Sequence, residues 1–201
     1  LHVVRCFDND NIIHVDTSID PVRDKETIDI ELQLKDLETV EKRLERVKRT
    51  AKTGNKEAQA ELVVLLKIQE TLLQGVSVRA LDFSEKDLEF VQPLQFITAK
   101  PVLYVCNVDE NSAVSGNDYV EKIKEAVKNE NAEVIVLAVG TEADITELDD
   151  FEERQLFLAD IGLAEAGVSR LVRSAYKLLN LQTYFTAGVK EVRAWTINVG
   201  S

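Results

Sequence analysis

The sequence predicts an α/β protein in which a parallel sheet is interrupted by an antiparallel helical hairpin. Residues 102–106 and 134–139 are continuous apolar runs, the pattern of strands that are covered on both faces. A helical stretch at 117–129 separates them, and strand–helix–strand order with apolar strands is typical of a parallel βαβ unit. Residues 23–53 contain neither glycine nor proline and repeat apolar residues every three or four positions, as in a long helix.

Composition limits the classes of function. Of the 201 residues, 45% are hydrophobic and 30% are charged, which is ordinary for a globular protein. A net charge of −12 argues against general affinity for nucleic acid and leaves room only for a local basic patch. No apolar run has the length of a membrane span, and no signal-peptide pattern opens the chain. Cys6 and Cys106 lie in apolar runs, so we expect buried free thiols.

The first residues resemble a strand followed by an Asp/Asn turn cluster at 8–11. His2 and His14 have no partners at metal-ligand spacing, so we expect loop or strand-edge positions for them. Because the chain begins with Leu1 and contains no methionine, we expect it to be an internal piece of a longer protein.

Asp20-Pro21 predicts a helix entrance. The apolar stripe that follows has one phase shift and is coiled-coil-like; its residues are Ile30, Leu34, Leu37, Val40, Leu44, Val47 and Ala51. Gly54-Asn55 predicts a tight turn, and a second helix follows until Gly75. Its expected apolar face consists of Ala58, Leu62, Leu65, Leu66, Leu72 and Leu73. Two long helices joined by a tight turn pack antiparallel, so residues 23–75 are expected to form an arm.

The tip of this arm is basic. Residues 42–56 contain seven Lys or Arg and one Glu, a net charge of +6. Because the whole chain has a net charge of −12, the remaining residues together carry −18. Cations near a helix C-terminus are favourable and account for two or three of the seven. We expect Arg43, Arg46, Arg49 and Lys52 to contact a phosphate-rich partner such as RNA; a solvated helix face is the alternative.

Further elements follow the arm. Ser84 and Asp87 predict a capping box that opens a short helix through Val91. The strand at 134–139 is expected to end at Gly140, an acidic helix to end at Gly162, and another helix to span 168–179. Residues 183–197 are rich in aromatic and β-branched residues, which predicts a β-hairpin and a second domain beginning near residue 182.

Asn107 and Glu110 follow the apolar run at 102–106, where ligands bind in open α/β sheets. A carboxylate there can accept hydrogen bonds from a purine edge while the asparagine amide braces the loop. An ordinary polar turn is the alternative. The loop at 138–141 is expected beside the Asn107 loop, with Ala138 and Val139 on the opposite side of a bound base.

The order of these features resembles the Obg-like ATPases of the YchF type, a branch of the P-loop GTPase superfamily. The resemblance covers the whole chain. It rests on Val4-Arg5-Cys6-Phe7, residues 12–15, Asp20-Pro21, Asn107-Val108-Asp109-Glu110 and residues 183–196, TYFTAGVKEVRAWT. It implies a partial G domain at 1–22 and 76–181, a coiled-coil hairpin inserted at 23–75, and the beginning of a TGS domain at 182–201.

The resemblance also implies a cytoplasmic, ribosome-associated enzyme that hydrolyses ATP or GTP with Mg²⁺. The sequence has no Gly-x-x-x-x-Gly-Lys-Ser/Thr loop, which cradles phosphates in this superfamily. We therefore expect the Mg²⁺ ligands in a part of the protein that precedes Leu1, and we expect this chain alone to be inactive. A non-catalytic module that binds RNA or the ribosome through the hairpin is the alternative function.

The choice of base follows from the motif. Many GTPases have Asn-Lys-x-Asp, in which the carboxylate accepts two guanine protons. Val108 replaces that lysine here and Glu110 replaces that aspartate. The longer carboxylate suits guanine less well, while main-chain groups near Val108 can serve adenine, so ATP is favoured over GTP. Asp109, one position earlier, leaves the register of the carboxylate open.

Overall fold

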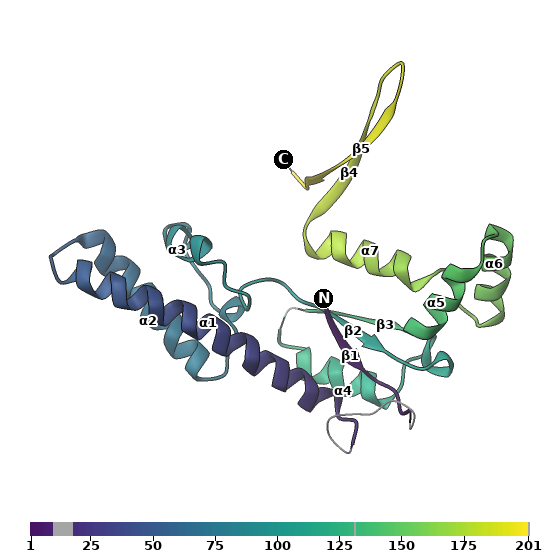
Figure 1. Ribbon diagram of the computed structural model, residues 1–201, viewed down its shortest axis with the longest axis horizontal. Coiled ribbons are helices and arrows are strands. Elements are labelled where there is room, and N and C mark those ends of the chain that lie inside the picture. Colours follow the sequence, from purple (N-terminus) through teal and green to yellow (C-terminus); the bar gives the residue numbers. More distant parts are fainter. Residues whose placement is uncertain (10–17, 131, 201) are drawn as a thin grey trace. The chain divides into compact units, whose positions relative to one another are not determined.

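The computed structural model describes residues 1–9, 18–130 and 132–200 (Figure 1). The predicted features at residues 12–15, including His14, lie outside the described residues. Internal contacts divide the chain into two compact units. The first unit comprises Leu1–Val22 and Val102–Ser201, and the second comprises Arg23–Pro101.

A parallel three-stranded sheet is the centre of the first unit. Its strands are β1 (His2–Arg5), β2 (Leu103–Asn107) and β3 (Glu133–Leu137), in the order β1-β2-β3. The register pairs Val4 with Cys106, and Cys106 with Val136. In Figure 1 the helices α4 (Asp118–Val127) and α7 (Gly167–Leu178) lie on opposite sides of these strands. The predicted α/β class and parallel sheet are confirmed.

The core of this unit lies between α4 and the sheet. Val120, Ile123 and Val127 of α4 recur at helical spacing and pack against Val4 and Tyr104. Cys6 and Cys106 are buried in the same cluster as free thiols, as expected. A hydrogen bond with the Cys106 sulfur, together with burial, raises the pKa of the Cys6 thiol. Cys6 therefore stays protonated and unreactive at neutral pH.

The chain beyond β3 departs from the expected pattern. β3 ends at Leu137, and the residues expected to form a loop at 138–141 begin the helix α5 (Val139–Glu147). The apolar run continues through Ala138 and Val139, so the sequence gives no sign of the change from strand to helix. The expected acidic helix is α6 (Phe151–Asp160), with Asp150 as its N-cap. An antiparallel pair follows α7, formed by β4 (Leu181–Ala187) and β5 (Val192–Asn198).

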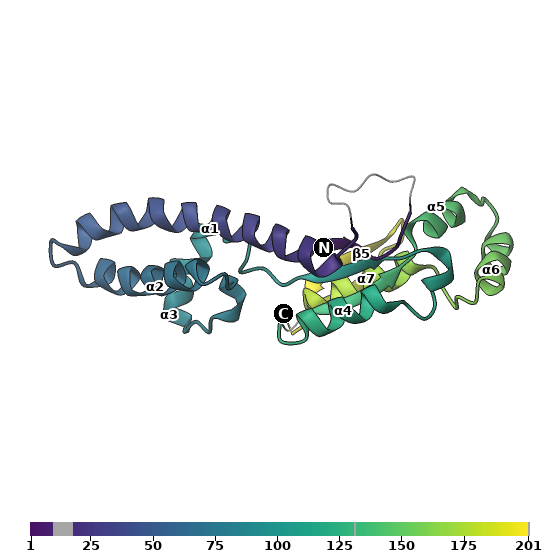
Figure 2. The ribbon, with the colours of Figure 1, turned by 90° about the horizontal axis from the view of Figure 1, so that it is seen from below.

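The second unit is built on two long helices, α1 (Pro21–Ala51) and α2 (Lys56–Leu73), which lie side by side and antiparallel (Figure 2). Asp20 accepts a hydrogen bond from the amide of Val22 at 3.1 Å, which explains the helix entrance. Asn55 caps α2 by accepting from the amide of Ala58 at 2.9 Å. Gly54 between the helices has φ +86°, a conformation that favours glycine.

The seam between α1 and α2 differs from the expected apolar stripe. Ile30 and Leu34 are 55% and 56% exposed, because the 18 residues of α2 cover only part of the 31 residues of α1. On α2, Leu66 and Leu73 are exposed as well. The buried positions from Gln33 onward follow a spacing of three and four that includes polar residues: Gln33, Asp36, Val40, Leu44, Val47 and Ala51 on α1, and Ala58, Glu61, Val64, Leu65, Ile68 and Leu72 on α2. The faces predicted from apolar residues did not include Gln33, Asp36 and Glu61, because these three residues are polar.

Residues 76–101 pack with this hairpin, although the sequence boundary was expected at residue 75. They contain two 3₁₀ turns, η1 (Val78–Ala80) and η2 (Gln92–Leu94), and the helix α3 (Glu85–Val91). Ser84 and Asp87 form the predicted capping box. Val78, Val91 and Phe96 belong to the same buried cluster as Leu44 and Leu65, so apolar burial holds this segment on the hairpin.

A buried carboxylate fastens the returning chain to α1. Asp36 is 2% exposed, and its two carboxylate oxygens accept from the amides of Ile97 at 2.8 Å and Thr98 at 2.7 Å. Thr98 in turn accepts from the amide of Val78 through its hydroxyl at 3.1 Å.

None of the helices in the described part of the chain combines the length and the apolar composition needed to cross a membrane.

Asp36→Ala is expected to lower the free energy of unfolding by about 3 kcal/mol, because two buried amides lose a charged acceptor. Urea denaturation followed by circular dichroism measures the change. The control Glu38→Ala removes an exposed carboxylate from the same helix and is expected to change stability by less than about 0.5 kcal/mol. Equal losses in the two variants would contradict the assigned role of Asp36.

Candidate functional site

Asn107 stands at the carboxyl end of β2 and accepts hydrogen bonds from residues just beyond both neighbouring strands. Its carbonyl accepts from the amide of Cys6 at 2.7 Å, directly beyond β1. Its side-chain oxygen Oδ1 accepts from the amide of Val139 at 3.1 Å, at the first residue of α5. The amide of Val108 donates to the carbonyl of Leu137 at 2.9 Å. The loop after β2 and the start of α5 after β3 therefore lie side by side; the sequence predicted this neighbourhood, although it predicted a loop at 138–141.

The residues after Asn107 have distinct structural roles. Val108 is buried, with 4% of its surface exposed. Asp109 is the N-cap of the 3₁₀ turn η3 (Glu110–Ser112), and its side chain accepts from the amide of Ser112 at 3.0 Å. Glu110 is exposed. Asp109 is therefore engaged in its own turn, whereas Glu110 is the exposed carboxylate of this pair.

A second asparagine closes the same loop. Asn117 caps α4 by accepting from the amide of Val120 at 3.2 Å, and its side-chain amide donates to the carbonyl of Cys6 at 2.7 Å. Opposite this loop, Ala138 is buried and Val139 is 45% exposed. The structure thus brings Asn107 against Val139 and places the exposed apolar side chain of Val139 at this edge of the sheet, while the side chains of Val108 and Ala138 are buried.

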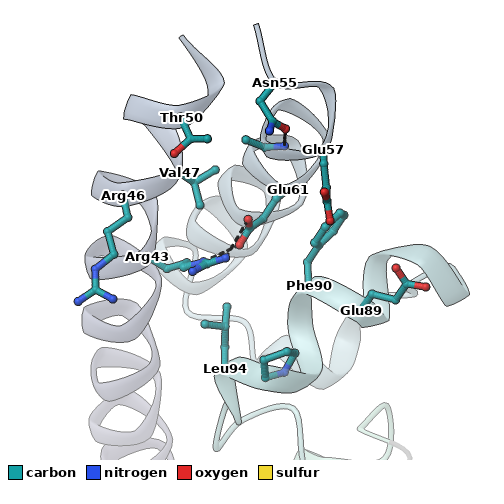
Figure 3. Close-up of a pocket in the computed structure, with 12 residues that line it drawn as sticks. Arg43, Arg46, Val47, Thr50, Asn55, Glu57, Glu61, Glu89, Phe90 and Leu94 are labelled. Atoms are coloured by element: carbon teal, nitrogen blue, oxygen red, sulfur yellow. Dashed lines mark hydrogen bonds and ion pairs between the residues drawn. The ribbon is translucent and has the colours of Figure 1, made fainter. Parts of the chain in front are cut away.

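At the basic end of the hairpin, Arg43 forms an ion pair that the sequence did not predict. Arg43 donates from Nε and Nη2 to the two carboxylate oxygens of Glu61, at 2.6 and 3.0 Å (Figure 3). The buried Glu61 raises the pKa of Arg43 through these hydrogen bonds. Arg43 therefore joins α1 to α2. Arg46, Arg49 and Lys52, the other three predicted contacts, are exposed.

Comparison with known proteins identifies the family. No family model matches the chain. The "Ribosome-binding ATPase YchF" of Escherichia coli O157:H7 is 50% identical over 200 residues, 100% of this chain and 54% of that protein. The protein of the same name from Bacillus subtilis is 47% identical over 201 residues, 99% of this chain and 55% of that protein. The chain belongs to the YchF family.

A solved structure agrees with this assignment. The YchF GTPase of Schizosaccharomyces pombe matches 99% of this chain and 55% of its own chain, with a TM-score of 0.86 and 34% identity. The chain thus spans about half the length of the YchF proteins that it matches. The resemblance to this family predicted from the sequence motifs is confirmed.

Sequence reasoning missed two residues near the site of this YchF chain, Glu142 and Gly167. Glu142 is buried, and its carboxylate accepts from the amides of Gly167 at 2.6 Å and Val168 at 3.3 Å, at the start of α7. A carboxylate is favourable at a helix N-terminus. Because Glu142 lies three residues after Val139 on α5, it fixes the turn that Asn107 contacts. In the sequence Glu142 is one acid among many, so no pattern marked it.

Gly167 is required by close packing at this contact. A Cβ atom there would lie 2.2 Å from Cδ2 of Leu137 and 2.6 Å from Oε1 of Glu142. Both neighbours are buried, so neither has room to withdraw.

Gly167→Ala is expected to lower the free energy of unfolding by about 2 kcal/mol, because the added methyl group overpacks the contact between α5, β3 and α7. Gly140→Ala is the matched control: no atom lies within 4 Å of its added Cβ, and alanine favours the α5 helix. Chemical denaturation of both variants measures the difference. A Gly167→Ala protein as stable as the Gly140→Ala protein would contradict this account.

Proposed function

We propose that this chain forms the base-binding end of a nucleotide-hydrolysing switch that takes ATP in preference to GTP and docks on the ribosome. The observation that carries the proposal is the hydrogen bond between Asn107 Oδ1 and the amide of Val139. It joins two loops at the carboxyl ends of neighbouring parallel strands, where α/β folds bind ligands. The names of the YchF relatives, "ribosome-binding ATPase" and "GTPase", support both parts of the proposal.

In this proposal the base lies between the Glu110 loop and the Ala138–Val139 turn. Val139 offers an exposed apolar surface for the ring. Main-chain groups beside Val108 and Ala138 serve the adenine edge, which needs one acceptor and one donor. Glu110 can accept from an exocyclic amino group, while Asp109 remains bound to its own turn. Asn107 positions the turn, and Glu142 supports it from behind.

In this proposal, the residues that bind the phosphates and Mg²⁺ lie outside this chain. The described part of the chain contains no group of three or more His, Cys, Asp or Glu residues that could hold a metal ion. The chain also has no glycine-rich loop of the kind that cradles phosphates and supplies a Mg²⁺ ligand in P-loop proteins. The YchF relatives are longer than this chain, and we propose that their additional length supplies those groups.

Nucleotide titration calorimetry on the intact protein tests the base site. Asn107→Ala is expected to weaken ATP and GTP binding about tenfold, because the Val139 turn loses its brace. Glu110→Asp is expected to raise the ratio of GTP to ATP affinity, since a shorter carboxylate restores the arrangement suited to guanine. Asn129→Ala, in the turn after α4, is the control and should bind as the unmodified protein does. A native preference for GTP of tenfold or more would contradict the choice of base.

The ribosome-docking part of the proposal rests on charge. The net charge of +6 over residues 42–56 stands against a chain total of −12, and such segregation is the electrostatic footprint of phosphate contacts. Arg46, Arg49 and Lys52 are the proposed contacts. We infer that Arg43 supports them indirectly, through its ion pair with Glu61. If the intact protein bound no nucleotide, this docking role would remain as the alternative, non-catalytic function.

Charge reversal tests the docking surface. The triple variant Arg46→Glu, Arg49→Glu, Lys52→Glu is expected to lose most co-sedimentation with ribosomes at low salt, because three phosphate contacts become repulsive. Reversal of Lys35, Lys67 and Lys86, which are exposed away from the tip, changes the net charge equally and serves as the control. Equal co-sedimentation of the two triple variants would reject the tip as the docking surface.

Two further assignments complete the proposal. A ribosome-bound protein of this kind works in the cytoplasm, in keeping with the names of its YchF relatives. The β4–β5 hairpin, with the segment TYFTAGVKEVRAWT, is proposed as the beginning of a TGS-like β domain.

A further inference from the structure

A cleft of about 550 Å³ lies between the hairpin and α3, within the second unit (Figure 3). This volume is within the range of about 300–1,000 Å³ for small-ligand pockets. Residues from three segments line it: Arg43, Arg46, Val47 and Thr50 from α1, Asn55, Glu57, Ala58 and Glu61 at the turn and on α2, and Glu89, Phe90, Pro93 and Leu94 on α3 and η2. The cleft lies at the same end of the hairpin as the basic tip.

The interior of the cleft combines an apolar surface with acceptor groups. Val47 and Ala58 are buried, and Leu94 and Phe90 are half-buried against the same cluster. In Figure 3 the side chain of Glu57 points toward the ring of Phe90. A cleft lined by a half-buried aromatic ring and a carboxylate suits a planar ligand that carries hydrogen-bond donors.

Charges around the cleft are divided by position. Glu61 is paired with Arg43, so it is not available to a ligand. The exposed carboxylates of Glu57 and Glu89 remain on the α2 and α3 sides, and the exposed guanidinium of Arg46 remains on α1. Beyond Arg46 lie the cations of the tip, including Lys48, Arg49 and Lys52. A ligand that suits this arrangement has anionic groups outside and N–H donors inside.

We propose that this cleft binds one guanine base of a single-stranded RNA whose phosphates lie on the basic tip. The proposal rests on the RNA-docking role proposed above and extends it to base recognition. Single-stranded RNA presents its bases for stacking on aromatic side chains and for hydrogen bonding on the Watson–Crick edge. Among the four bases, guanine alone offers two adjacent donors there, N1–H and N2–H₂, to one carboxylate.

Peptide ligands fit this surface less well. A basic peptide that matched Glu57 and Glu89 would be repelled by the net charge of +6 over residues 42–56. An acidic peptide that matched the tip would be repelled by the two carboxylates. RNA satisfies both parts, because its backbone is anionic and its guanine edge donates hydrogen bonds.

Fluorescence anisotropy with the intact protein tests the proposal. The probes are labelled octauridylates that carry one central guanosine, one central adenosine, or neither, each titrated at several salt concentrations. We expect the guanosine probe to bind about tenfold more tightly than octauridylate, the size of a single base-stacking contribution. Phe90→Leu, which keeps an apolar side chain in the core, is expected to remove about tenfold of that affinity. Glu57→Gln is expected to remove the preference for guanosine over adenosine.

The salt dependence separates this proposal from the docking role. Phe90→Leu and Glu57→Gln should leave the slope of affinity against salt concentration unchanged, while Lys52→Ala should reduce it for all three probes alike. Equal binding of all probes, unaffected by Phe90→Leu but reduced by Lys52→Ala, would overturn the base site and keep the docking role. Absence of binding to every probe would overturn both. Phe90-dependent binding of a lysine-rich peptide, with none of RNA, would instead make the cleft a peptide site.

Discussion

Parallel pairing places the ends of β1, β2 and β3 at one edge of the sheet, and the site at that edge depends on how Asn107 uses its hydrogen-bonding groups. Its main chain binds the residue beyond β1, and its side chain binds the first residue of α5 beyond β3. A single residue thus fixes two loops relative to each other. Buried Val108 anchors the loop below, so Glu110 extends from a supported turn. Ligand groups held on rigid elements lose little entropy on binding.

The opposite side of the same turn is fixed by a different kind of contact. Glu142 places a negative charge at the N-terminus of α7, and Gly167 lets the two helices and Leu137 approach closely. Arg170 of α7 also donates to the carbonyl of Val136 at 3.0 Å, which holds the helix on β3. The Val139 turn is therefore constrained on one side by the side-chain oxygen of Asn107 at the end of β2, and on the other by Glu142 of α5, whose carboxylate accepts from the amides at the start of α7.

In the hairpin unit, three polar residues occupy core positions of α1 and α2 and are satisfied by distant partners. Asp36 binds the amides of residues 97 and 98, Gln33 donates to the carbonyl of Gly75 at 3.0 Å, and Glu61 accepts from Arg43. A seam of aliphatic residues alone permits helices to slide by one heptad, whereas a buried polar group has one position in which it is paired. We infer that these three residues set the register of α1, α2 and the returning segment. The cleft under the basic tip is a product of that register.

The sequence by itself determined the parallel strands, the long hairpin, the capping box at Ser84 and the family, because each depends on local patterns: apolar runs, helical spacing, turn residues and a specific fourteen-residue segment. It also placed Asn107 and Glu110 at the end of a strand. Because the strands were predicted to be parallel, it further predicted that Val139 lies beside the Asn107 loop. Only the tertiary structure decided that Arg43 belongs to an ion pair and that α5 begins at Val139. These outcomes depend on partners up to 32 residues away in the chain, as between Asn107 and Val139, and residue type and spacing do not encode which distant group will satisfy a given polar atom.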